Sequence, residues 1–159
     1  MNKEITKDQF ELMKIRLEEN GGIEIHWNEI DSSSGQIIVD GLIRKSKRIP
    51  QEALTDEIRD LVEPLKEVIE AKSWENVEMI GFTMKGTTEK MVVVLSGKKQ
   101  IKNGQKLPVN PKVAIEDDVF GVESQIKETV NNVIDKAFSY LYEGHCLQPE
   151  LGLKENAAE

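Results

Sequence analysis

The pattern of apolar and polar residues between positions 77 and 115 predicts consecutive strands joined by short turns. The run at 91–95 contains three adjacent valines, whose β-branched side chains favour an extended backbone. Because this run is apolar on both faces, it predicts an interior strand that is covered on both sides. Residues 77–84 predict the strand before it, and Gly97 predicts a bulge or bend near its end.

A hairpin turn is predicted at Asn103-Gly104, because both positions tolerate positive φ. The return strand, from residue 105 to about 115, contains Pro108 and Pro111. Neither proline can donate a hydrogen bond to a neighbouring strand, so this strand is expected at a sheet edge, at least in part. Pairing through that edge could build a homo-oligomer.

The residues before this meander predict a helix, a hairpin and a second helix. Phe10, Met13 and Leu17 recur at helical spacing after a capping box at 6–9, and Asn-Gly-Gly at 20–22 predicts a helix end. Alternation at 23–30, followed by an apolar run at 36–43, predicts a hairpin.

A long apolar stripe predicts the second helix over about 50–72, and Pro64 should kink or split it. A last helix is predicted over 122–143, with Gly144 as its C-cap. The order α-β-β-α-β-β-β-α favours an α+β class: a single domain over 1–145, with a mainly antiparallel sheet of about five strands and helices packed on it. Residues 146–159 are expected to form a tail that is flexible or docked on a partner.

Composition describes an acidic globular protein whose basic residues are unevenly placed. The 159 residues carry 29 Asp and Glu against 21 Lys and Arg, for a net charge of −8. This acidic excess disfavours non-specific binding to nucleic acid or to an anionic membrane. No apolar run approaches the roughly 20 residues of a membrane-spanning helix. One cysteine, Cys146, excludes an internal disulfide, and with no apolar leader at residues 1–5 we expect a cytoplasmic location.

Two basic clusters stand out against this background. The first lies at 44–48, and residues 81–112 contain seven lysines against one glutamate. If both clusters reach one end of the sheet, they predict a patch that follows the phosphates of a nucleic acid. Protection of a sheet edge against aggregation is the alternative role for the second cluster. The candidate residues are Arg44, Lys45, Lys47, Arg48, Lys98, Lys99, Lys102 and Lys106.

Catalytic motifs are not found. The chain has no GxGxxG, GxSxG or P-loop pattern, and two histidines with one cysteine are too few for a structural zinc site. We therefore predict no cofactor, no metal and no catalytic residue, and an enzyme is the less favoured class. A nucleotide-binding protein or enzyme whose site is assembled across subunits is kept as a third hypothesis.

Residues 80–86, 92–99 and 103–104 together resemble small uncharacterised proteins of phages and prophages. The resemblance covers about a third of the chain, and it transfers no functional residue. It implies an accessory role in DNA metabolism or in interference with a host system. The leading hypothesis is therefore a non-enzymatic accessory or inhibitory protein that binds a host or phage protein, and the second is a nucleic-acid-binding accessory factor.

Overall fold

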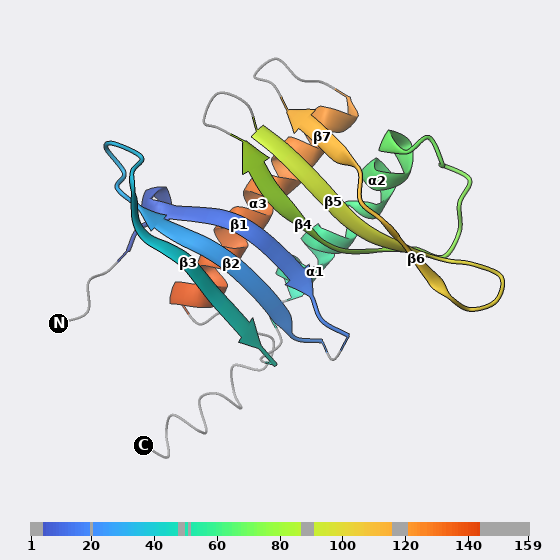
Figure 1. Cartoon of the computed structure of the whole chain (residues 1–159), viewed down its shortest axis with the longest axis horizontal. Helices are drawn as coiled ribbons and strands as arrows, with labels where there is room; N and C mark the ends of the chain where they lie inside the picture. The colour runs from blue at the N-terminus through green and yellow to red at the C-terminus, as the bar shows by residue number, and fades with distance from the viewer. Residues whose placement is uncertain are drawn as a thin grey trace.

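Seven strands form one antiparallel sheet, and the helices lie on a single face of it (Figure 1). This computed structural model describes residues 5–19, 21–47, 50, 52–86, 91–115 and 121–143. The predicted α+β class is confirmed, with seven strands in place of about five. The strands are β1 (Phe10–Leu17), β2 (Ile23–Ile30), β3 (Ile37–Ser46), β4 (Val77–Gly86), β5 (Met91–Gln100), β6 (Lys106–Val109) and β7 (Lys112–Ile115). The helices are η1 (Lys7–Gln9), a single 3₁₀ turn, α1 (Glu52–Arg59), α2 (Val62–Val68) and α3 (Val122–Tyr142).

The strand order is β3-β2-β1-β4-β5-β6, and β7 also pairs with β5. The predicted return strand is therefore two short strands, which pair with different parts of β5 at the edge that the prolines indicated. The predicted turn between β5 and β6 is confirmed. Gly104 has φ of 84°, and the Asn103 side chain accepts a 2.9 Å hydrogen bond from the N–H of Gln105.

The hydrophobic core lies between the sheet and the helices. In β5, Val93 and Leu95 are buried, whereas Val92 and Val94 on the opposite face are only half-buried. The prediction that both faces of this strand are covered is therefore wrong, because the described helices cover one face only. The predicted bulge at Gly97 lies on the neighbouring strand, since the β4–β5 register shifts between Met79 and Gly81. Gly97 itself pairs with Met79 and Val109, and it leaves room for the Leu65 side chain of α2.

Residues 10–17 form a strand, which corrects the predicted first helix. Phe10, Leu12 and Ile15 are buried. The pairing with β2 shifts by one residue between Leu12 and Lys14, so Met13 is the extra residue of a β-bulge. The bulge moves the next inward position from 14 to 15, and the resulting spacing imitates that of a helix. Gly21 belongs to the β1–β2 hairpin turn rather than to a helix cap.

The predicted helix over 50–72 is divided into α1 and α2, as Pro64 suggested. The break falls at 60–61, and Pro64 occupies the first turn of α2. A proline is tolerated there because the N–H groups of a first turn have no partner within the helix. Leu61 and Leu65, on either side of Pro64, are fully buried and attach this helix to the core.

The end of α3 is fastened to β2 through Tyr142. Its hydroxyl accepts a 2.9 Å hydrogen bond from Trp27 Nε1 and donates a 2.8 Å bond to Glu29 Oε2. Burial and the bond to Glu29 raise the pKa of Tyr142 to about 12. Phe10 and Phe138 complete an aromatic cluster around this contact.

Some predictions fall on residues outside the described ranges. They are Arg48, the helix cap at Gly144, Cys146 and the tail at 146–159. The domain boundary at 145 therefore stays a prediction. Among the described helices, none has the length and apolarity needed to span a membrane.

Candidate functional site

The sheet divides where β1 and β4 part. These strands pair only through Lys14–Thr83, Ile15–Phe82 and Arg16–Gly81. The C-terminal end of β1 and the N-terminal end of β4 are no longer paired with each other. There, among the described strands, β1 pairs only with β2, and β4 pairs only with β5. An extra residue at Ile80 shifts the β4–β5 pairing at the same level, so β4 bends there.

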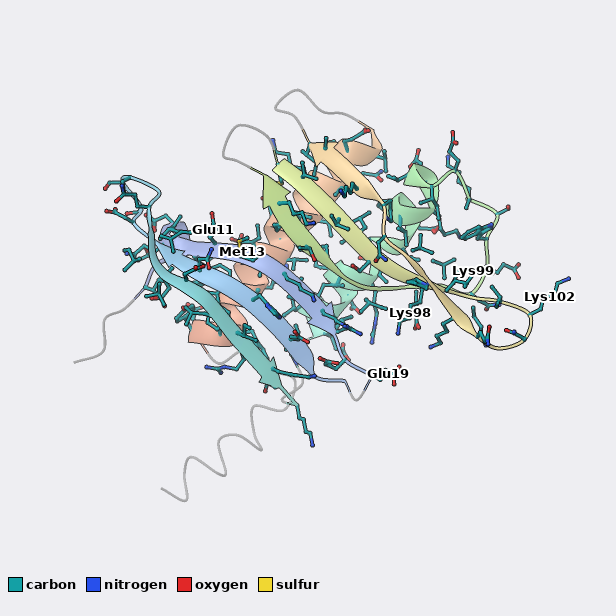
Figure 2. All side chains as sticks on the ribbon, in the orientation of Figure 1. Glu11, Met13, Glu19, Lys98, Lys99 and Lys102 are labelled. Atoms are coloured by element: carbon teal, nitrogen blue, oxygen red, sulfur yellow. The ribbon has the colours of Figure 1, made fainter. Side chains whose placement is uncertain are left out.

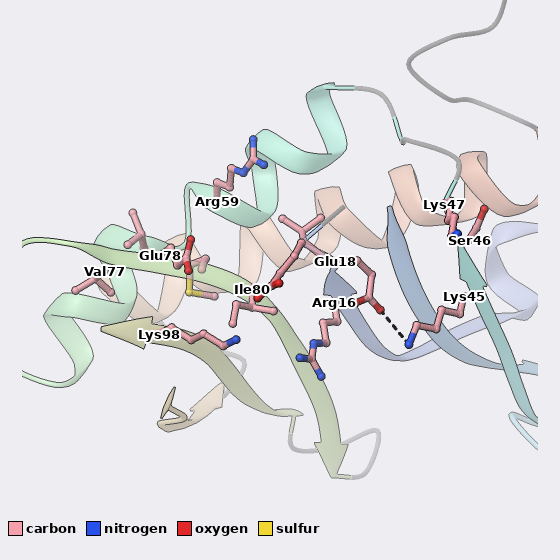
Figure 3. Close-up of a pocket in the computed structure, with 14 residues that line it drawn as sticks. Arg16, Glu18, Lys45, Ser46, Lys47, Arg59, Val77, Glu78, Ile80 and Lys98 are labelled. Carbon is pink, nitrogen blue, oxygen red and sulfur yellow. Dashed lines mark ion pairs between the residues drawn. The ribbon is translucent and has the colours of Figure 1, made fainter. Parts of the chain in front are cut away.

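A cleft of about 940 Å³ lies between these separated strand ends (Figure 3). It is bordered by the ends of β1 and β3, by α1 and α2, by the start of β4 and by β5. Five of its lining residues are cationic: Arg16, Lys45, Lys47, Arg59 and Lys98. Three are carboxylates: Glu18, Glu19 and Glu78. None of the described residues that line it is aromatic.

The cleft brings together members of both predicted basic clusters. Lys45 and Lys47 come from the end of β3 and Lys98 from β5, and all three line it. Arg44 does not: it pairs with Ile25 on the face that carries the helices, and its charge acts on Tyr142. Arg48 lies outside the described residues. Among the described residues, the two predicted basic clusters therefore meet only through Lys45, Lys47 and Lys98.

The other candidate lysines belong to the β5–β6 hairpin and do not line the cleft; Figure 2 shows where Lys99 and Lys102 lie. Lys99 donates a 2.5 Å hydrogen bond to the carbonyl of Glu75 and lies 5.9 Å from the ring centre of Trp74. Lys106 pairs with Glu78 at 2.9 Å, and Lys102 is exposed in the turn. These contacts fit a solvated sheet edge rather than one continuous basic surface.

Charge in the cleft is partly compensated. Glu78 is bound by Lys106, which lies outside the cleft lining, and that contact raises the pKa of Lys106. Arg16, Glu24 and Lys45 lie opposite one another on β1, β2 and β3. A hydrogen bond from His26, whose Nε2 is 2.5 Å from Glu24 Oε2, lowers the pKa of Glu24. Glu24 is therefore ionised at neutral pH and screens its two cationic neighbours.

Four of the cleft cations have no ion pair with a described residue: Arg16, Lys47, Arg59 and Lys98. Arg16 nevertheless lies opposite Glu24 in the sheet. Figure 3 shows Lys98 reaching from β5 toward the gap that Arg16 and Glu18 border. Glu18 has a buried Oε1 with no hydrogen-bond partner among the described residues. Its nearest cation, Lys45 Nζ, is 3.8 Å away, beyond hydrogen-bond distance.

Sequence reasoning missed Arg16, Glu18 and Arg59. The predicted first helix, which ends at 20–22, contains the first two, and Arg59 is not distinguished from the other charged residues of the second predicted helix. One local signal was available, since Asn20-Gly21 has the same hairpin chemistry as Asn103-Gly104. A hairpin at 20–21 would have placed Arg16 and Glu18 at a strand end.

A second candidate binding site is the outer edge of β3, which is the first strand in the sheet order. Ile37, Ile38 and Ile43 are 52%, 55% and 61% exposed. The pairing of β3 with β2 is interrupted twice in its first half, whereas 42–46 pairs in unbroken register. Asn28 stabilises the irregular part, since its side chain accepts a 2.9 Å hydrogen bond from the N–H of Gly41.

Comparison with known proteins yields no match to a family model, a curated protein or a solved structure. Within the described residues, no group of three or more His, Cys, Asp or Glu is arranged to hold a metal ion. A fold class by itself does not define an activity. Function must therefore be argued from the cleft and from the β3 edge.

Proposed function

We propose that this chain is a non-enzymatic binding protein that captures an extended segment of a partner protein at the outer edge of β3. The observation that carries the proposal is the exposure of three isoleucines on a ten-residue strand that pairs on one side only among the described residues. An edge strand offers backbone donors and acceptors to an added strand, and apolar side chains give that addition its affinity. A cytoplasmic phage-type accessory role remains part of this proposal.

Charge defines the chemistry of the partner segment. The regular part of β3, residues 42–46, contains Ile43 followed by exposed Arg44 and Lys45. A second copy of β3 paired antiparallel over all of 42–46 would place Arg44 opposite its own copy, and like charges facing each other destabilise a strand pair. An acidic segment with an apolar residue opposite Ile43 fits better.

The first prediction tests this edge by site-specific crosslinking. A photoreactive amino acid at Ile43, in the full chain expressed in bacterial cells, is expected to crosslink to one polypeptide. The matched control is Leu107 on β6, at the other side of the sheet and 48% exposed. With the purified partner, Ile43→Glu should weaken binding at least about tenfold, or roughly 1.4 kcal/mol, and Leu107→Glu less than about twofold.

Identical crosslinking from Ile43 and Leu107 would contradict the proposal, because exposure alone would then explain both. Equal loss of binding in the two glutamate variants would do the same. Sedimentation of the same samples tests the homo-oligomer predicted for the edge at 105–115. If the crosslinked product is a second copy of this chain, the edge is a self-association surface and the partner proposal is wrong.

Nucleic-acid binding is the second candidate, favoured by the convergence of Lys45, Lys47 and Lys98 in one cleft. These positive groups could hold backbone phosphates and would make affinity strongly salt-dependent. Bases would not be stacked there, since the cleft lining described above lacks aromatic side chains. Little dependence on base sequence is therefore expected.

The second prediction compares two charge-reversal triples of equal size. In the first, Lys45, Lys47 and Lys98 become glutamate; in the second, Lys99, Lys102 and Lys112 do, none of which lines the cleft or forms an ion pair with a described residue that lines it. Anisotropy of labelled DNA and RNA at about 50 and 200 mM salt should show at least tenfold weaker binding in the cleft triple and a salt slope reduced by roughly 2–3. Equal effects of the two triples, or no binding by the unmodified protein at low salt, would rule out the cleft as a nucleic-acid site.

A further inference from the structure

We propose that the cleft between β1 and β4 binds a small phosphorylated ligand of the nucleotide class, with cations for its phosphates and Glu18 as the acceptor for a hydroxyl or amino group. This proposal is independent of the β3 edge. It shares the cleft with the nucleic-acid candidate but does not require a polymer. Three features of the cleft support it.

The first feature is size and origin. A volume of about 940 Å³ lies near the upper end of the range of about 300–1,000 Å³ that ligand pockets occupy. The cleft follows from the backbone, since β1 and β4 share only three residue pairs before they separate. Most of its wall is formed by strands and helices, which hold side chains more firmly than loops do. Glu18, Glu19 and Lys47 lie just beyond the ends of β1 and β3.

The second feature is its charge, which is opposite in sign to that of the whole chain. Five cations face three carboxylates in the cleft, within a protein of net charge −8. Glu78 is already paired with Lys106. Glu24 lies opposite both Arg16 and Lys45 in the sheet, and its negative charge reduces the positive potential of these two residues. Lys47, Arg59 and Lys98 remain as positive groups for an anion, and a concave wall concentrates their field.

The third feature is Glu18, which distinguishes a nucleotide from a simple anion. Its Oε1 is buried and has no hydrogen-bond partner among the described residues. Its ion-pair partner, Lys45 Nζ, is 3.8 Å away and makes no hydrogen bond to it. Because buried polar atoms are ordinarily hydrogen-bonded, a donor group of a ligand would supply the bond that this oxygen lacks. An inorganic polyphosphate at neutral pH has few protons to give, whereas a sugar hydroxyl or a base amino group donates one readily.

Apolar side chains complete the match to this class of ligand. Leu17, Val62, Val77, Met79 and Ile80 line the cleft beside the charged groups. They provide an apolar wall for a ring, although without an aromatic partner for stacking. The cleft therefore combines phosphate-binding cations, one acceptor and an apolar surface.

The test is calorimetric titration of the full chain with ATP and, separately, with tripolyphosphate, which has the phosphate chain but no sugar or base. We expect ATP to bind more tightly than tripolyphosphate. Lys98→Glu should weaken both at least about tenfold, whereas Lys102→Glu, the same charge change in the β5–β6 turn, should alter neither more than about twofold. Glu18→Leu should lower the ratio of ATP to tripolyphosphate affinity at least about fivefold, because leucine keeps the size but removes the acceptor.

Several outcomes would overturn the inference. They are no heat with either ligand at millimolar concentration, equal affinities for the two ligands, or equal losses in Lys98→Glu and Lys102→Glu. If Glu18→Leu does not fold, as judged by circular dichroism, the Lys98 and Lys102 pair still decides the outcome. Binding of a DNA or RNA strand without binding of ATP would overturn this inference and leave the nucleic-acid candidate standing.

Discussion

Replacing Gly81 with alanine should destabilise the fold by about 3 kcal/mol or more. A Cβ at this position would lie 1.9 Å from the carbonyl oxygen of Ile15 and 2.8 Å from the Cα of Arg16. Both are backbone atoms of β1, so no rotation of a side chain can relieve the clash. Because β1 and β4 share only three residue pairs, the loss of the Arg16–Gly81 pair would weaken the connection between the two halves of the sheet.

Urea unfolding measures this effect, and Gly97→Ala is the matched control. A Cβ at Gly97 would meet the Cδ2 of Leu65 at 2.6 Å, but that atom is the end of a side chain, and the nearest backbone atom, the carbonyl oxygen of Glu78, is 3.1 Å away. A loss of about 1 kcal/mol is expected there. A Gly81→Ala protein that fails to fold while Gly97→Ala folds would agree with the prediction. Similar urea midpoints for the two variants would contradict the prediction, because β1 and β4 could then move apart at Gly81 without loss of stability.

Ile15→Ala is expected to cost about 2–5 kcal/mol of unfolding free energy, as large-to-small changes in a core do. Ile15 is fully buried, because the bulge at Met13 turns it toward the helices. Met13→Ala should cost about 1 kcal/mol or less, because the bulge leaves Met13 only half-buried (Figure 2).

These two variants also separate the strand from the helix predicted for the same residues. The helical stripe contained Phe10, Met13 and Leu17 but not Ile15, so a helix would reverse the order of the two effects. Chemical unfolding of both variants under identical conditions decides between them. A larger loss for Met13→Ala than for Ile15→Ala would contradict the strand assignment.

The error at β1 has a definite physical cause. A regular strand alternates with a period of two residues, and the inward positions 10, 12, 15 and 17 break that period at Met13. Without the partner strand, this spacing cannot be told apart from a helical stripe. The bulge exists because β1 must pair with β2, and that pairing is not visible in residues 10–17 alone.

The candidate site was predicted only as far as local composition allowed. The clusters containing Lys45, Lys47 and Lys98 are evident in the sequence, but their meeting depends on β1 lying between β2 and β4. Arg44 lies on the opposite face of β3 from Lys45, and Lys99 and Lys106 have contacts of their own. Neighbouring lysines therefore differ in role because alternate residues of a strand face opposite sides.

The sequence by itself determined the α+β class, the hairpin over 23–43, the turn at Asn103-Gly104 and the long last helix, because periodicity, glycines and prolines act over a few residues. It also determined that the return strand lies at a sheet edge, since Pro108 and Pro111 cannot donate hydrogen bonds there. Only the tertiary structure decided that β1 is a strand, that the helices cover one face and that the sheet divides beside Gly81. Those features arise from pairing between distant segments, and the cleft exists because two of these segments, β1 and β4, pair over three residues and then separate.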